Sequence, residues 1–153
     1  MAVVISEERP DTSDAASLIG ELDAHLASLY AVESRHGFSV EKLLGDGVTF
    51  FVTRDGGRPA GCGGVLLVGR EYAEIKRMYV RPAFRGRRLG HLMLDRLVAH
   101  ARHHGLTVIR LETGVHQHEA IALYERYGFR PIPPFGPYRD DPVSRCYEMR
   151  LVG

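Results

Sequence analysis

The sequence has no apolar run close to the 20 or so residues that a helix needs to cross a bilayer. Residues 1–8 also lack the basic start and the long apolar stretch of a secretory signal. The first absence excludes a membrane span, and the second predicts that the protein stays in the cytoplasm. The mild formal net charge of +1 argues against a membrane partner.

Cysteine and net charge are both scarce. The chain has 2 cysteines, Cys62 and Cys146, which we interpret as small buried apolar residues, because a reducing compartment disfavours a structural disulfide. The formal net charge is +1 and the isoelectric point is near 7.9. This balance is too mild to indicate a nucleic-acid partner for the whole molecule, so any role of charge must be local.

Repeats, low-complexity tracts and linker-like stretches are missing as well. A chain of 153 residues with 44% apolar and 25% charged residues suits one compact domain. We therefore predict a single domain over residues 1–153.

Strand and helix patterns alternate along the first half of the chain. They predict a strand at 3–6, an amphipathic helix after the cap residues 11–14, and strands at 48–53 and 60–68 joined by a tight turn at 55–57. The second of these strands contains Gly61, Gly63 and Gly64. Glycines inside a strand indicate a bulge, a packing gap or a close approach by backbone or ligand.

The strand predicted at 72–80 carries polar side chains on both faces. Strict alternation places Glu74, Lys76, Met78 and Val80 on one face, and it places Ile75, Arg77 and Tyr79 on the other. A central strand tolerates this only where one side opens onto a polar site or where a bulge interrupts the ladder.

A basic, glycine-containing loop at 81–90 follows this strand and leads into a helix that ends near His104. Unpaired N–H groups at a helix start attract phosphate, and the helix dipole adds partial positive charge there. The alternative is a solvated cluster of arginines. Further along, a strand is predicted at 107–113 and a helix at 119–127, ended by Gly128.

These two regions carry a family resemblance that covers roughly residues 48–151. The pattern Val80-x-Pro82 followed by Arg85-x-x-x-Leu89-Gly90 resembles the coenzyme A pyrophosphate motif of the GNAT acyltransferase superfamily, with Arg88 where that family usually has glycine. The segment 117–129 resembles the family pattern Asn-x-x-Ala-x-x-Leu-Tyr-x-x-x-Gly-Phe, with Gln117 in place of asparagine.

The resemblance implies an α/β (α+β) GNAT fold. Its sheet is mixed but mostly antiparallel, has six to seven strands, and is splayed between the fourth strand (72–80) and the fifth (107–113). About four helices flank the sheet. Acetyl-coenzyme A (acetyl-CoA) is implied as the co-substrate, with no metal. The residues implied to bind it are Met78, Tyr79, Val80, Arg85, Gly86, Arg87, Arg88, Leu89, Gly90, Gln117, Ala120 and Tyr124.

The same resemblance implies an N-acetyltransferase in which a neutral amine attacks a thioester directly. This reaction needs a base for the amine, a donor for the carbonyl oxygen and an acid for the leaving thiolate. Tyr124 is implied as the acid, Glu74 as the base and the Met78 N–H as the donor. The other interpretations are a core tyrosine at 124, a solvated Glu74, and an auxiliary base at His116 or His118. The histidines at 100, 103 and 104 are read as helix-end residues.

The acceptor is the least determined part. A small primary amine that carries a carboxylate fits the stiff, charged loop 131–145, where Arg139 or Arg145 could pair with the acid and Asp140 or Asp141 with the ammonium. A protein or peptide acceptor and a non-catalytic acetyl-CoA sensor remain open, as does a homodimer. A nucleic-acid-binding module that uses the arginines at 77–88 is a further alternative, which the near-neutral net charge disfavours.

Overall fold

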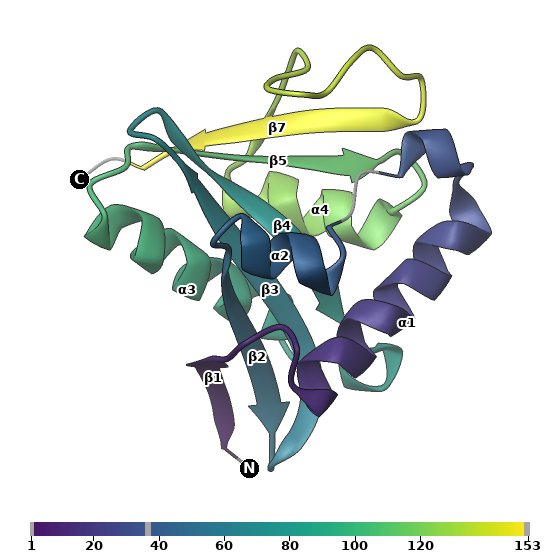
Figure 1. Cartoon of the computed structure of the whole chain (residues 1–153), viewed down its shortest axis with the longest axis vertical. Helices are drawn as coiled ribbons and strands as arrows, with labels where there is room; N and C mark the ends of the chain where they lie inside the picture. The colour runs from purple at the N-terminus through teal and green to yellow at the C-terminus, as the bar shows by residue number, and fades with distance from the viewer. Residues whose placement is uncertain (1, 36–37, 152–153) are drawn as a thin grey trace.

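The computed structural model describes residues 2–35 and 38–151 (Figure 1). The strands are β1 (Val3–Glu7), β2 (Thr49–Asp55), β3 (Arg58–Val68), β4 (Tyr72–Val80), β5 (Val108–Gly114), β6 (Arg130–Ile132) and β7 (Ser144–Arg150). The helices are α1 (Ser13–Leu29), α2 (Val40–Gly45), α3 (Leu89–His103) and α4 (His118–Tyr127), with short 3-10 turns at Val32–Ser34 and Pro82–Phe84.

All seven strands form one sheet in the order β1-β2-β3-β4-β5-β7-β6. Neighbouring strands are antiparallel except for β4 and β5, which are parallel. The predicted mixed, mostly antiparallel sheet is therefore confirmed. The β2–β3 hairpin turns at Gly56 and Gly57, whose φ angles of 60° and 83° fit the positive-φ turn expected there.

The helices cover both faces of the sheet (Figure 1). Side chains along β2 alternate between the two faces of the sheet. Phe50 and Val52 lie in a core beneath α1 and α2, and Phe51 lies in a core beneath α3 and α4. Helix α1 begins at a cap where the Thr12 hydroxyl accepts a hydrogen bond from the Ala15 N–H at 3.3 Å. The two cores hold the sheet between two helical layers.

The sheet opens between its two parallel strands, as predicted. Strands β4 and β5 are paired only at Ala73 with Ile109 and at Glu74 with Arg110. Beyond Glu74 the register has no further pairs, although β4 continues to Val80 and β5 to Gly114. The splay lies at the carboxyl ends of both strands, where open α/β sheets bind their ligands.

A bulge in β4 corrects the alternation predicted for this strand. Cys62 pairs with Tyr79 and Gly64 with Lys76, so Gly63 alone stands opposite residues 77 and 78. Arg77 takes a φ of 56°, a left-handed conformation unusual for a residue other than glycine.

The bulge changes which side chains share a face. Arg77 bonds to α1 and therefore lies on the same face as Lys76, whereas Met78 packs with the α3 and α4 core. The predicted grouping of Met78 and Val80 with Glu74 was wrong, because the extra residue shifts the alternation by one position.

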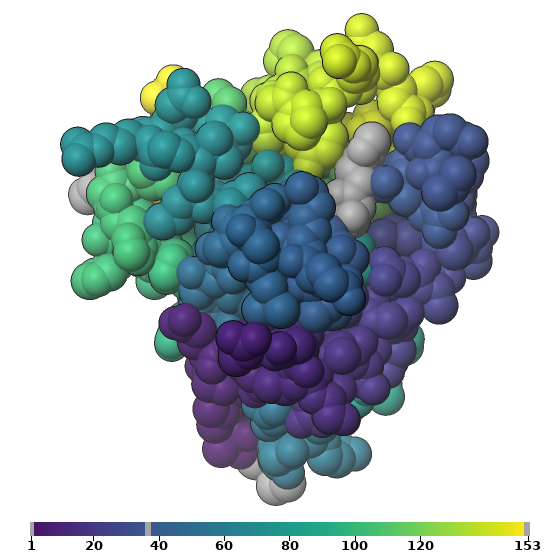
Figure 2. Space-filling model, viewed as in Figure 1, coloured from purple at the N-terminus to yellow at the C-terminus, as the bar shows by residue number. Residues whose placement is uncertain are grey.

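The loop between β6 and β7 covers one end of the molecule. Figure 2 shows this loop at the top, with the segment that follows α1 close beside it. Cys62 and Cys146 are both free thiols and both are buried. Within the described residues no helix is long and apolar enough to cross a membrane.

Candidate active site

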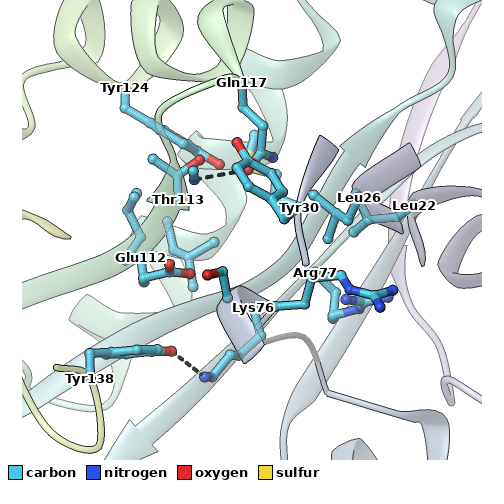
Figure 3. A pocket seen from close by; sticks show the side chains of 16 residues that line it. Leu22, Leu26, Tyr30, Lys76, Arg77, Glu112, Thr113, Gln117, Tyr124 and Tyr138 are labelled. Atoms are coloured by element: carbon cyan, nitrogen blue, oxygen red, sulfur yellow. Dashed lines mark hydrogen bonds between the residues drawn. The ribbon is translucent and has the colours of Figure 1, made fainter. Parts of the chain in front are cut away.

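A cavity lies at the splay between β4 and β5 (Figure 3). Its walls come from both strands, from α1 and the segment after it, from the start of α4 and from the β6–β7 loop. The lining residues are Leu22, Leu26, Tyr30, Ser34, Arg35, Ile75, Lys76, Arg77, Met78, Leu111, Glu112, Thr113, Gly114, Gln117, Tyr124 and Tyr138. Three residues predicted from the second motif and β4, namely Met78, Gln117 and Tyr124, meet here.

Tyr124 reaches the cavity from α4. Its residue is 6% exposed, and its ring packs edge-on against Phe129 in the core with ring centroids 5.8 Å apart. Burial raises the pKa of the Tyr124 hydroxyl well above its ordinary value, and the nearby Glu112 carboxylate raises that pKa further. This hydroxyl therefore keeps its proton at neutral pH and can donate a hydrogen bond.

The loop before α3 has the backbone of an anion-binding turn. Gly86 has a φ of 78°, and Arg88, which caps the helix, has a φ of 62°. The first helical hydrogen bond runs from the Leu92 N–H to the Arg88 carbonyl at 3.0 Å, so the N–H groups of residues 89–91 point out of the helix start. Arg88 thus adopts the conformation for which the family pattern uses glycine.

The two motifs touch each other. Arg85 bonds through Nε to the Val80 carbonyl at 3.3 Å, and it lies 3.4 Å from the Glu119 carboxylate on α4. A β-carbon at residue 90 would lie 2.7 Å from Cδ2 of Leu123, so Gly90 permits the close approach of α3 and α4. Ala120 packs against the same core from α4.

The arginines near the loop have acidic partners. Arg81 holds Glu21 with two nitrogens, and the Tyr79 hydroxyl bonds to the same carboxylate at 3.2 Å. Arg87 lies 2.9 Å from Asp55. These pairs compensate positive charge that a nucleic-acid backbone would otherwise bind.

Glu74 lies in a buried polar triad at the cavity edge. Its carboxylate accepts a hydrogen bond from the Tyr138 hydroxyl and forms an ion pair with Lys76 at 2.9 Å. Lys76 also donates to the Tyr138 hydroxyl at 2.8 Å (Figure 3). Among the described residues, Lys76 and Tyr138 line the cavity and Glu74 stands behind them. Burial raises the pKa of Tyr138, and so does the Glu74 charge.

Tyr30 connects the segment after α1 to the start of α4. Its hydroxyl accepts a hydrogen bond from the His116 N–H at 3.0 Å, and its ring stacks on the His116 ring at 5.5 Å. The Gln117 side-chain oxygen accepts from the Gly114 N–H at 2.9 Å. The turn between β5 and α4 is therefore fixed from both sides.

Sequence reasoning missed several lining residues, among them Tyr30, Arg35 and Tyr138. Tyr138 lies in the loop assigned to the acceptor, so its proline-rich, aromatic composition was a usable signal. Arg35 had no such signal. The charged loop residues named for the acceptor do not line this cavity in the described structure. Asp140, Asp141 and Arg145 line a separate, shallow pocket beside Cys146.

Among the described residues, no histidine lines the cavity. The rings of His100 and His104 lie at the end of α3, tilted by 46° with centroids 4.5 Å apart, as expected for helix-end residues. Over residues 2–35 and 38–151, no three metal-ligating side chains form a cluster.

Comparison with known proteins agrees with this geometry. Residues 19–129 match the model of the acetyltransferase (GNAT) family. The chain is 41% identical over 150 residues to an IAA acetyltransferase of Azospirillum brasilense, which covers 97% of this chain and 98% of the relative.

Solved structures share the fold. A protein of Klebsiella pneumoniae, provisionally named an acyl-CoA N-acyltransferase, is 34% identical with a TM-score of 0.84, covering 98% of both chains. A GNAT acetyltransferase of Elizabethkingia anophelis with acetyl-CoA bound has a TM-score of 0.73 at 18% identity, covering 97% of this chain and 98% of that one. This chain belongs to the acetyltransferase (GNAT) family and is an acyltransferase.

Proposed function

We propose that residues 1–153 form one N-acetyltransferase domain that transfers the acetyl group of acetyl-CoA to a primary amine of a small, amino-acid-like molecule. The observation that carries the proposal is the position of the Tyr124 hydroxyl in a cavity at the strand splay. That cavity is also lined by Met78 and by Lys76 and Tyr138, which form with Glu74 a buried triad able to accept a proton.

The chain's own residues fit acetyl-CoA. The N–H groups of residues 89–91 and the positive-φ turn at Gly86 and Arg88 suit a pyrophosphate, and Arg85, Arg87 and Arg88 are exposed beside it. The edge of β4 that is not paired with β5, from Met78 through Tyr79 to Val80, offers backbone groups to a pantetheine arm. Gln117 lines the cavity at the start of α4, and Ala120 on α4 is proposed to contact the same arm. Bound there, acetyl-CoA supplies an acyl carbonyl activated as a thioester.

Each catalytic role then has a candidate. The Met78 N–H, at the bulge, is a donor for the carbonyl oxygen. Tyr124 retains its proton and donates it to the sulfur. Glu74 receives the amine proton through the Tyr138 hydroxyl, which passes its own proton to the carboxylate and takes up that of the amine.

Direct transfer is favoured over a covalent intermediate on cysteine. Burial raises the pKa of Cys62 to about 12 and also raises that of Cys146. Neither thiol is part of the cavity wall in the described structure. A reactive thiolate is therefore not available where the acyl group would lie.

A small acceptor is favoured over a protein terminus because the cavity wall includes side chains from two segments outside the two motifs. These are Tyr138 from the β6–β7 loop and Ser34 and Arg35 from the segment after α1. The named activity of the Azospirillum relative also supports a small acceptor.

The test is release of free thiol from acetyl-CoA across a panel of amines, amino acids and peptides. We expect turnover with small amines and little with peptides. Turnover confined to peptides or protein termini would replace the small acceptor with a macromolecular one, and binding of acetyl-CoA without any turnover would contradict the catalytic roles.

A further inference from the structure

The cavity wall carries more positive than negative charge. Its ionisable side chains, apart from the tyrosines, are Arg35, Lys76 and Arg77 against a single carboxylate, Glu112. Lys76 is already compensated by Glu74 and Tyr138. Arg77 also forms an ion pair, with Asp23 on α1, whose side chain is 60% exposed. Arg35 and Arg77 are the two cations of the wall that lie outside the triad of Glu74, Lys76 and Tyr138.

Both arginines have a buried nitrogen without a partner. Arg77 uses one terminal nitrogen for the Ile19 carbonyl at 3.3 Å and for Asp23, yet its side chain is 2% exposed and its Nε bonds to nothing in the described structure. The Nε of Arg35 is likewise buried and unpartnered among the described residues. Buried N–H groups almost always have a hydrogen-bond partner. Two buried N–H groups without a partner, on two arginines of the same cavity wall, therefore need an explanation.

The backbone conformation of Arg77 also indicates a functional position. This residue sits at the bulge with a φ of 56°, although an arginine gains nothing from a left-handed conformation. The bulge turns the Arg77 side chain toward α1, onto the face that carries Lys76, whereas strict alternation would have placed it on the opposite face. Strain kept at a cavity wall is typical of functional positions.

We propose that Arg35 and Arg77 bind the carboxylate of the acceptor, which makes the substrate an amine that carries an acid. Guanidinium N–H groups match carboxylate oxygens in charge and in fork geometry, and in a buried site they bind better than a lysine would. This inference rests on the proposed transfer to an amine and names the class of that amine.

The opposite wall suits the ammonium end of such a molecule. Figure 3 shows Glu112 on β5 and Arg77 on β4 at opposite sides of the cavity. Glu112 accepts a hydrogen bond from Ser144 at 2.6 Å, which holds its carboxylate in place. Tyr124 lies on the same side as Glu112 in Figure 3, so a zwitterion bound between the walls has its amine beside the proposed acid. Leu22 and Leu26 line the cavity beside the arginines and suit an apolar side chain.

Measurements of binding test the proposed carboxylate site without requiring turnover. Phenylacetate and its uncharged amide, phenylacetamide, are titrated by calorimetry into wild type, Arg35→Gln and Arg77→Lys, with Arg70→Gln as the control because Arg70 is exposed and outside the cavity wall. We expect phenylacetate to bind wild type and the control about tenfold or more tightly than the amide. Arg35→Gln should abolish that preference and Arg77→Lys should reduce it. Equal binding of both probes, or no phenylacetate binding at millimolar concentration, overturns the proposal.

Turnover separates this proposal from the function it rests on. Amino acids are compared with the amines formed by removing their carboxylate, for example phenylalanine with phenethylamine. We expect a higher kcat/KM for the acids, which Arg35→Gln lowers through KM. If no amine is acetylated but phenylacetate binding still needs Arg35, the transfer function fails and the carboxylate site stands. If the decarboxylated amines react as well as the acids, the carboxylate site fails and the transfer function stands.

Discussion

The hydroxyl of Tyr30 occupies the position that a β-carbon on Gly114 would take. Residue 114 ends β5 and Tyr30 follows α1, so this contact joins two segments that are far apart in the chain. Since the same hydroxyl accepts the His116 N–H, the turn into α4 depends on a glycine at 114.

Gly114→Ala should lower the free energy of unfolding by about 1–3 kcal/mol, because the added methyl group must displace Tyr30. Urea denaturation measures this. Gly20→Ala is the control: a β-carbon at position 20 on α1 meets nothing within 4 Å, so alanine should stabilise by about 0.5–1 kcal/mol. The cost at 114 should shrink in a Tyr30→Leu background. An unchanged cost there would show that Tyr30 is not the obstacle.

Arg88→Gly should raise the free energy of unfolding by about 1 kcal/mol. Arg88 holds a φ of 62°, which glycine adopts without the penalty that a β-carbon brings. Gly86→Ala, two residues earlier at a φ of 78°, should act in the opposite direction by a similar amount. Midpoints of urea denaturation compare the two. Destabilisation by Arg88→Gly would mean that the arginine side chain contributes more than its backbone strain costs.

Glu74→Gln should lower kcat by about 100-fold or more and alter the pH–rate profile, because the amide cannot take up a proton. The control is Glu148→Gln, which breaks an ion pair of 2.8 Å with Arg110 outside the cavity wall. Thermal unfolding checks that both variants are folded. A pH–rate profile unaltered by Glu74→Gln removes this residue from the base role.

The stability of the protein should fall as the pH drops below about 6.5 because of His100. Burial lowers the pKa of His100 in the folded state, and the neighbouring His104 lowers it further. Below the unfolded-state pKa of about 6.5 the unfolded chain binds the extra proton more readily, so folded-state stability is full above that pH and is lost toward the lower folded value.

Urea denaturation at pH 7 and pH 5 measures this effect. His100→Gln should narrow the difference between the two pH values, whereas His103→Gln, on the same helix end, should change it less. An identical pH dependence in wild type and His100→Gln would assign the effect to other groups.

Most of the fold could be predicted from the sequence because its patterns are local. The predicted strand at 72–80 matches β4 over its whole length, and the helix ends at Gly105 and Gly128 follow from glycines at φ angles of 79° and 123°. Strands β6 and β7 and helix α2 were not identified individually. Strand β6 has three residues and α2 has six, too few to establish a periodicity.

The site was predictable where one segment carries a whole motif, as around Tyr124. The parts of the site in which contacts join distant segments were harder to predict. The polar faces of the 72–80 strand indicated a bulge or a polar site, and both are present, but no pattern located the bulge at Arg77 or predicted that α1 would bind it. Tyr30, Arg35 and Tyr138 come together only through the tertiary fold.

The most direct test of the account is the rate of thiol release from acetyl-CoA by Tyr124→Phe. Tyr127→Phe, one helical turn away with its hydroxyl on Asp95 at 2.7 Å, is the matched control. With the small amine that wild type acetylates best, kcat of Tyr124→Phe should fall by about 100-fold to 10,000-fold while coenzyme A still binds, and the control should stay near the wild-type rate. Equal rates for Tyr124→Phe and wild type would contradict the assignment of Tyr124 as the acid of this acyltransferase.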